Sequence, residues 1–409
     1  MSHGSVSLMM LVSPALFAQS LVGSGYADLI RKAFDAAPSA APLVCSVTPV
    51  SPLLDFSLRF HTGYVIKIPL GTYQGARHKW VALLRVTPKD GGPVYFAAGL
   101  KMPNLPAQVD TNGEVWGGFL VGEGRYRVEL LVVDDLHRVC QNQWQIRTTE
   151  PGGARHADLA IAPGAVQELG SELSPRQPPE DAPIERLTIL VQAAPLLRSH
   201  STLQNVDIAA LAEMSTLLLA KLPARSVRLV VFNLAQQAVL FRSDPPARFD
   251  VHAAIQAMRK LQLAEISYGA LRDPLGSAAL LDSLVWGELL DARPSGVVVF
   301  LGPRIESPDI SRESLVRSPQ GALRFFYVQY APLHMVVSNP TPMFRADMKS
   351  IDDLDDDSEQ YLPAPAESDG IEHLVKSLKG ETIVVRKPAD LGSAIRRITR
   401  AIAADRSVQ

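Results

Sequence analysis

Two kinds of hydrophobic pattern divide the chain. Between residues 44 and 148, apolar and polar residues alternate with a period of two, which predicts strands with one buried face. Glycine, asparagine and aspartate clusters separate these runs, as in antiparallel hairpins. The predicted strands are Leu54–His61, Tyr64–Leu70, Trp80–Pro88, Val94–Lys101, Glu114–Leu120, Arg125–Val133 and Arg138–Arg147. This density of short strands predicts an immunoglobulin-like β-sandwich over residues 44–148.

The second half of the chain has a different pattern, in which continuous apolar runs alternate with helical periodicity. Strands are predicted at Leu187–Ala193, Ser226–Asn233, Ala238–Arg242, Gly296–Leu301, Arg324–Gln329 and Glu381–Val385. Asp250 and Asp390 are good N-caps for two of the intervening amphipathic helices. This alternation predicts a doubly wound, Rossmann-like α/β domain over residues 187–409. The chain is therefore expected to be a multidomain protein. Ligands of such sheets usually bind at the carboxyl ends of the strands.

Two further segments fall outside both patterns. Residues 149–186 are rich in proline and glycine and are expected to form a linker, with the apolar run Leu159–Ala162 as one edge strand. Residues 338–370 contain the acidic run Asp352–Glu359 and two prolines, which favours a solvated loop. The acidic spacing does not match an EF-hand, so we expect no calcium site there.

The N-terminus and the cysteines bear on the location of the protein. Residues 1–18 contain the uncharged stretch Val6–Ala18, which has the length and the final small residue of a secretory signal, although no Lys or Arg precedes it. We therefore expect an exported protein, periplasmic, cell-surface or secreted. Export favours a disulfide between Cys45 and Cys140, the only two cysteines. The alternative is two unpaired buried thiols.

Composition and motifs exclude several functional classes. The 409 residues carry a formal net charge of −2, which lacks the basic excess of a nucleic-acid binder. After residue 18 no uncharged apolar window is long enough to span a membrane. The chain has no Gly-x-Ser-x-Gly, Ser-x-x-Lys, His-Glu-x-x-His or Cys-x-x-Cys motif. We therefore expect no cofactor and no local catalytic motif.

The order of elements from Leu187 to about Ala404 resembles the von Willebrand factor type A domain. The resemblance rests on a strand and helix, a strand pair, the helix opening at Asp273–Ala278, the strand Gly296–Leu301, and a closing strand and helix. With the predicted sandwich in front of it, the whole chain is similar to exported von Willebrand A-related proteins of Acidobacteria. The resemblance implies a protein-binding module.

Ligand-binding members of that family hold a metal ion with Asp-x-Ser-x-Ser, a threonine and a second aspartate. Here Gln192, Ala194 and Leu196 stand where the aspartate and two serines are expected. Asp273 lies near the threonine position, and Pro303 or Arg304 replaces the second aspartate. Mg²⁺ needs near-octahedral oxygen ligation, so the resemblance implies a lost metal site. A polar rim of Gln192, Asp273 and Arg304 remains, in which an Asp273–Arg304 ion pair could replace the metal.

Three functions are compatible with these observations. The one that fits best is a non-enzymatic, exported module that binds an unidentified protein partner. The second is an exported hydrolase of cell-wall or polysaccharide material that uses Asp134 and Asp135. Adjacent strand residues point to opposite faces, which argues against that carboxylate pair. The third is a cytosolic scaffold that retains residues 1–18 and keeps both thiols reduced.

Overall fold

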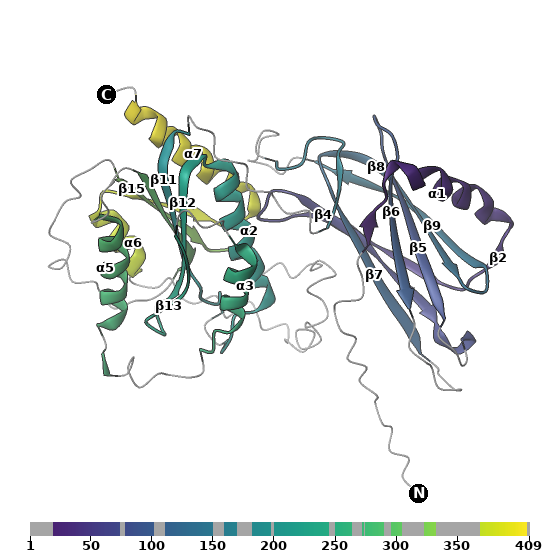
Figure 1. Cartoon of the computed structure of the whole chain (residues 1–409), viewed down its shortest axis with the longest axis horizontal. Coiled ribbons are helices and arrows are strands. Elements are labelled where there is room, and N and C mark those ends of the chain that lie inside the picture. Colours follow the sequence, from purple (N-terminus) through teal and green to yellow (C-terminus); the bar gives the residue numbers. More distant parts are fainter. Residues whose placement is uncertain are drawn as a thin grey trace, which may run out of the picture.

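The protein consists of a β-sandwich domain followed by an α/β domain (Figure 1). The computed structural model describes residues 19–73, 78–101, 111–149, 159–169, 182–197, 200–244, 250–263, 272–273, 275–289, 296–304, 323–332 and 369–406. Residues 1–18 and the acidic run 352–359 lie outside the described residues, so the expectations for them remain predictions.

Two sheets form the sandwich domain. The first has the order β1-β6-β5-β8-β9-β2 and the second the order β10-β7-β4-β3. The strands are β1 (Ser20–Leu21), β2 (Ala41–Pro42), β3 (Ser46–Leu54), β4 (Phe60–Pro69), β5 (Lys79–Pro88), β6 (Val94–Lys101), β7 (Asn112–Val121), β8 (Gly124–Asp134), β9 (Arg138–Thr148) and β10 (Val166–Glu168). The 3-10 turns Ala37–Ser39 and Leu70–Thr72 complete the domain.

Alternating side chains from both sheets fill one shared core. Tyr64 and Ile66 of β4 pack with Leu84 of β5 and Val128 of β8, and all four are almost completely buried. The period of two in the sequence therefore marks the inward faces of these strands. The predicted disulfide is confirmed: Cys45, just before β3, is bonded to Cys140 of β9, with the two Cα atoms 6.1 Å apart. The bond joins the two sheets at one edge of the sandwich.

The first predicted strand, Leu54–His61, is wrong. The chain reverses between β3 and β4, where Leu58 takes a positive φ of 56° and donates its N–H to the carbonyl of Asp55. Residues 55–59 form the tip of the β3–β4 hairpin, which we call the interface hairpin. Their apolar side chains alternate like those of a strand but pack against the α/β domain.

The N-terminal segment before the sandwich strands contains a helix that the sequence patterns did not predict. Helix α1 (Ser24–Ala36) packs Ile30 and Phe34 onto Tyr95 and Leu131, on the outer face of the six-stranded sheet. On either side of it, β1 pairs with β6 and β2 pairs with β9, each over two residues, so this segment covers a short stretch of both edges of that sheet.

The region expected to be a linker contributes an edge strand, as predicted, but at a different position. Residues 159–162 are irregular, and β10 begins at Val166 and pairs with β7. The α/β domain then begins with β11 at Ile184, three residues before the predicted strand.

The α/β domain has one six-stranded sheet with the order β13-β12-β11-β14-β15-β16. All neighbouring pairs are parallel except β12 with β13. The strands are β11 (Ile184–Gln192), β12 (Ala224–Asn233), β13 (Ala238–Ser243), β14 (Gly296–Pro303), β15 (Leu323–Tyr330) and β16 (Glu381–Val385). The helices are α2 (Asn205–Lys221), α3 (Val251–Arg259), α5 (Gly276–Leu289), α6 (Gly370–Ser377) and α7 (Pro388–Arg406).

Helices cover both faces of this sheet. Helices α2, α3 and α7 pack on one face against side chains such as Ile189 and Val299. Helices α5 and α6 pack on the other, against Phe300 and Tyr327 (Figure 1). Because both faces are buried, the strands are continuously apolar, as the sequence indicated. None of the described helices combines the length and the hydrophobicity that crossing a membrane requires.

The predicted helix caps can be checked directly. Asp250 caps α3, because its carboxylate accepts a hydrogen bond of 2.9 Å from the N–H of Ala253. Helix α7 begins at Pro388, two residues before the predicted cap Asp390. The Asp390 carboxylate instead reaches back to accept the N–H groups of Arg386 and Lys387, the reverse half of a capping box.

Candidate functional site

The carboxyl end of β11 carries a buried polar side chain. Gln192 is 1% exposed, and neither its amide oxygen nor its amide nitrogen forms a hydrogen bond with the described part of the chain. Gly302 of β14 lies directly against it, because a Cβ added to Gly302 would lie 2.8 Å from the Cβ of Gln192. The next two residues, Ala193 and Ala194, are also buried. This end of the sheet therefore buries an amide among small and apolar groups.

Leu196 is held in place through its backbone. Its N–H donates to the carboxylate of Asp207 at 3.3 Å, and the same carboxylate accepts the N–H of Gln204 in the capping box of α2. Burial raises the pKa of Asp207, and these two N–H groups offset part of the increase. Asp207 is an acidic residue near this edge that the sequence analysis did not single out.

The other predicted rim residues, Asp273 and Arg304, are exposed and do not form the expected ion pair within the described part of the chain. Asp273 accepts the N–H of Leu275 with its carboxylate, and its backbone carbonyl accepts the amide of Gln237 at 2.8 Å. These contacts hold Asp273 at the β12–β13 turn. Pro303 is buried, and its carbonyl accepts the hydroxyl of Tyr327 at 3.0 Å. The structure thus does not bring together the pair that was expected to replace the metal.

A second cluster lies where the interface hairpin meets α2. Leu58 is inserted into the core of the α/β domain. Phe56 packs edge-on against Tyr330, the last residue of β15, with the ring centroids 5.1 Å apart. The N–H of Phe56 donates to the Glu213 carboxylate of α2 at 3.1 Å. The hairpin thus joins the two domains by apolar insertion and by a buried hydrogen bond.

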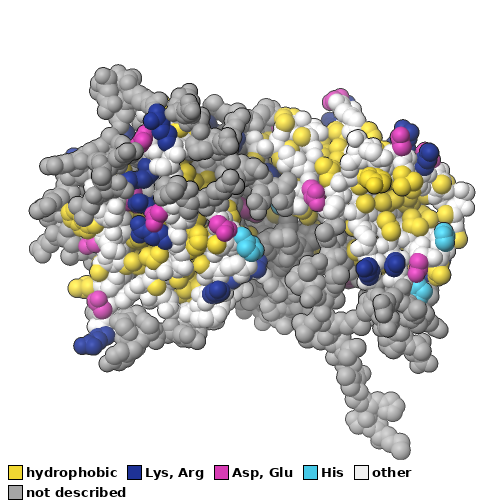
Figure 2. All heavy atoms as spheres, viewed as in Figure 1, with side chains coloured by type: hydrophobic (Ala, Val, Ile, Leu, Met, Phe, Trp, Pro, Cys, Tyr) yellow, Lys and Arg dark blue, Asp and Glu magenta, His cyan; other side chains and the backbone are white. Residues whose placement is uncertain are grey.

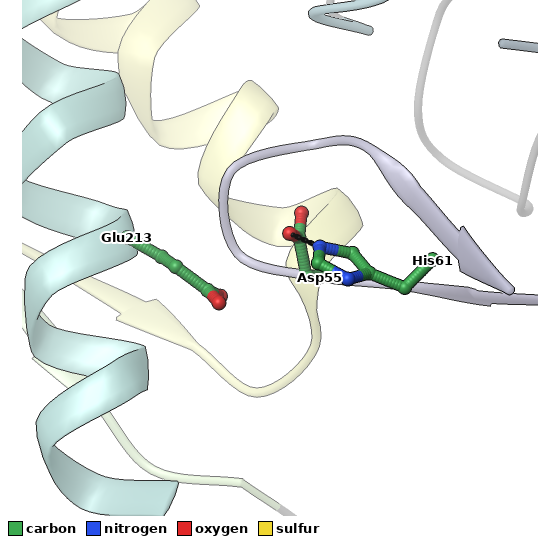
Figure 3. Close-up of side chains that lie close together, drawn as sticks. All are labelled: Asp55, His61 and Glu213. Atoms are coloured by element: carbon green, nitrogen blue, oxygen red, sulfur yellow. Dashed lines mark hydrogen bonds and ion pairs between the residues drawn. The ribbon is translucent and has the colours of Figure 1, made fainter. Parts of the chain in front are cut away.

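Asp55, His61 and Glu213 converge at this junction (Figure 3). One potential ligand atom from each residue lies within 4.8 Å of the others. Asp55 and His61 are hydrogen-bonded through Oδ2 and Nε2, and their side chains are 12% and 15% exposed. His61 Nδ1 is buried and has no hydrogen-bond partner among the described residues. Two carboxyl groups and an imidazole thus share a small, partly buried space.

The local hydrogen bonds make the two carboxyl groups unlike each other. Burial raises the pKa of Asp55, but His61, the hydroxyl of Ser57 and the N–H of Arg59 outweigh it, so the pKa lies below its ordinary value. Burial and the nearby charge of Asp55 raise the pKa of Glu213 well above its ordinary value. One carboxyl is thus held as an anion and the other is pushed towards its neutral form.

Sequence patterns do not reveal this cluster, because Glu213 is distant in the chain from Asp55 and His61, which are only six positions apart. The hydrogen bond between Phe56 and Glu213 spans 157 positions. The one local signal is the Asp-x-Ser spacing of Asp55 and Ser57, which is typical of a turn closed by side-chain hydrogen bonds. That signal would have identified the turn but not the partner helix.

The two carboxylates of the hydrolase alternative are already engaged. The Asp134 side chain is fully buried, and it accepts the guanidinium of Arg138 at 2.7 Å and the hydroxyl of Tyr73 at 3.0 Å. Asp135 faces His78, with 3.1 Å between Oδ1 and Nδ1. A buried, ion-paired Asp134 cannot reach a polysaccharide, so this pair does not form a glycosidase site.

Comparisons with known proteins give only weak similarities. No protein-family model and no curated protein matches the chain. The putative ApaA protein from Bordetella pertussis is 14% identical with a TM-score of 0.20, over 27% of this chain and 98% of that protein. The β-glucuronidase 2 from Bacteroides uniformis is 10% identical with a TM-score of 0.17, over 71% of this chain and 36% of the glucuronidase. Neither similarity is strong enough to inform the fold or the activity.

Proposed function

We propose that this chain is an exported, non-enzymatic binding protein, in which a von Willebrand A-like domain recognises a protein partner without a metal ion. The observation that carries the proposal is the buried, unpartnered Gln192 at the carboxyl end of β11. In metal-binding members of the family, the corresponding position supplies an aspartate, and the following serines correspond to Ala194 and Leu196. Since these side chains provide no carboxylate or hydroxyl, recognition at this edge relies on shape and apolar contact rather than on metal ligation.

The arrangement of the domain supports this proposal. The sheet is parallel apart from its edge strand β13, and helices lie on both faces. The order of elements is the one on which the resemblance to the von Willebrand A domain rests. The two-sheet sandwich with its inter-sheet disulfide supports an immunoglobulin-like fold for the first domain.

The disulfide also supports export, because such bonds persist in oxidising compartments and are rare in the cytosol. Intact mass spectrometry of the natively produced protein, with and without reductant and alkylation, tests this part. We expect a product cleaved near Ala18 with no alkylatable thiol until reductant is added. An uncleaved chain with two free thiols would favour the cytosolic scaffold instead.

Photo-crosslinking in the producing cells tests the binding role. A benzophenone amino acid replaces exposed Arg304, at the carboxyl end of β14, and in a control it replaces exposed Arg225, at the amino end of β12. We expect one discrete protein crosslinked from position 304, undiminished by EDTA, and none from position 225. Loss of the product in EDTA would refute metal-free binding, and equal products from both positions would refute recognition at this edge.

A further inference from the structure

We propose that Asp55, His61 and Glu213 form a binding site for one divalent transition-metal ion of the zinc class, which ties the sandwich domain to helix α2. The site is independent of the function proposed above, because none of its residues belongs to the Gln192 edge of the sheet. It also differs from the family's metal site in both position and ligand types.

The geometry provides a suitable starting point. Asp55 lies at the start of the β3–β4 turn, His61 near the start of β4 and Glu213 in the middle of α2, and the three side chains point towards one another (Figure 3). Ligand atoms around a tetrahedral zinc ion with bonds of 2.0–2.2 Å lie about 3.5 Å apart. The three atoms lie within 4.8 Å of one another, so binding of one ion requires the ligand atoms to adjust towards that spacing.

The hydrogen bonds around the cluster orient the ligands. The Ser57 hydroxyl donates to Asp55 at 2.7 Å, and the N–H of Arg59 donates to Oδ1 at 2.9 Å. The N–H of Phe56 donates to Glu213 Oε2. Glu213 Oε1 accepts no hydrogen bond from the described residues, so this oxygen can bind a metal. Outer hydrogen bonds of this kind hold carboxylate ligands in position at metal sites.

The donor atoms at the site suit a metal cation. His61 Nδ1 is buried and has no hydrogen-bond partner among the described residues, so it can offer a lone pair to a metal when Nε2 carries the ring proton and faces Asp55. Two carboxyl groups, of Asp55 and Glu213, lie beside it. This nitrogen and oxygen set suits zinc and its neighbours better than Ca²⁺ or Mg²⁺. The partial exposure of Asp55 and His61 leaves room for ion entry and for a solvent ligand.

Isothermal titration of the EDTA-treated, dialysed full chain with ZnCl₂ tests the proposal. We expect one zinc ion per chain, with affinity at least tenfold weaker in His61→Gln and in Glu213→Gln. The matched control is His78→Gln, because His78 also faces an aspartate but has no third ligand among the described residues. Zinc affinity that is unchanged in both ligand variants, or equally reduced in His78→Gln, would overturn the site.

A second measurement does not depend on the folding of any variant. X-ray absorption at the zinc edge of the wild-type chain, loaded with one equivalent, reports the ligand types. We expect one imidazole and a shell of oxygen atoms. Two or more imidazoles, or no bound zinc at this stoichiometry, would overturn the assignment to Asp55, His61 and Glu213.

Discussion

Asp134 is a buried carboxylate whose ionisation stabilises the fold. Burial alone would raise its pKa, but the Arg138 N–H and guanidinium and the Tyr73 hydroxyl lower it below its ordinary value. The folded state therefore holds this proton less tightly than the unfolded state, whose aspartates titrate near pH 3.9. The resulting stabilisation is complete above that pH and is lost as the pH falls through the folded-state pKa.

We predict that Asp134→Asn lowers the unfolding free energy by about 2 kcal/mol at pH 7, because a charged hydrogen-bonded pair is lost. The difference from wild type should shrink as the pH falls below about 4. Urea unfolding at several pH values measures both effects. Asp90→Asn, in the exposed β5–β6 turn, is the control and should have no effect. A deficit that persists at low pH would contradict the electrostatic explanation.

The unpartnered amide of Gln192 leads to the opposite expectation. Replacing it with leucine removes a buried polar group and breaks no hydrogen bond, so Gln192→Leu should preserve stability or raise it by about 1 kcal/mol. Asn233→Leu is the matched control. The buried Asn233 amide donates to the carbonyl of Ala193 at 2.6 Å and accepts the N–H of Gln236. The Asn233→Leu variant should therefore lower the unfolding free energy by about 1–3 kcal/mol. Equal losses in urea unfolding would mean that Gln192 is also partnered.

At the scale of the residue, sequence could predict the disulfide and the absence of carboxylate and hydroxyl oxygens at Gln192, Ala194 and Leu196. The disulfide can be predicted from the presence of two cysteines and an oxidising compartment. The missing oxygens can be read from the residues that directly follow a predicted strand. The convergence of Asp55 with Glu213 could not be predicted, because it depends on how two domains dock. No local pattern encodes that docking.

Among the elements, the interface hairpin is the one whose structure differs most clearly from the element that its hydrophobic pattern predicts. In and beside it, Leu54, Phe56, Leu58 and Phe60 alternate with polar residues, and this pattern is typical of a strand. The alternation is real, but Phe56 and Leu58 are buried by the other domain rather than by a sheet partner. Strands β4 to β9 were predicted well because their buried partners lie within the same sandwich. Helix α1 was missed because few apolar residues mark its single buried face.

The hairpin also leads to a test of domain coupling. We predict that Leu58→Ala destabilises the protein by about 2–5 kcal/mol, because it leaves a cavity in the α/β core. Calorimetry should show the transitions of the two domains moving apart. Leu53→Ala is the control, because Leu53 lies on β3 and is 43% exposed. A single sharp transition in both variants would contradict coupling through this hairpin.

At the scale of the whole molecule, the disulfide stabilises one domain only. The bond closes a loop of 95 residues that lies within the sandwich. In the chain-entropy model such a loop contributes roughly 4–5 kcal/mol. We predict that the double variant Cys45→Ala/Cys140→Ala lowers the sandwich transition in calorimetry more than it lowers the α/β transition. An equal shift of both transitions would indicate that the domains unfold as one unit.

Sequence could also predict the two-domain layout, because a period of two and a strand–helix alternation are long-range, repeated signals. The sheet is doubly wound, as expected from runs of apolar residues that only two covering layers of helices can bury. The ends of elements were less predictable, as the early start of β11 and of α7 shows. Such ends depend on capping and pairing contacts with distant residues.

The segment from β1 to β2 has a consequence for how the molecule avoids self-association. An open sheet presents unpaired N–H and C=O groups at both edges, which invite pairing with another copy. Here β1 occupies one edge and the short β2 the other, while α1 shields the apolar outer face between them. This cover has its own apolar surface, since Tyr26 and Leu29 are 68% and 66% exposed. Figure 2 shows a group of hydrophobic side chains on the face of the sandwich domain turned to the viewer. We therefore expect a proteolytic cut that released the segment to free both short stretches of strand edge together with the apolar face under α1, and so to promote association between sandwich domains.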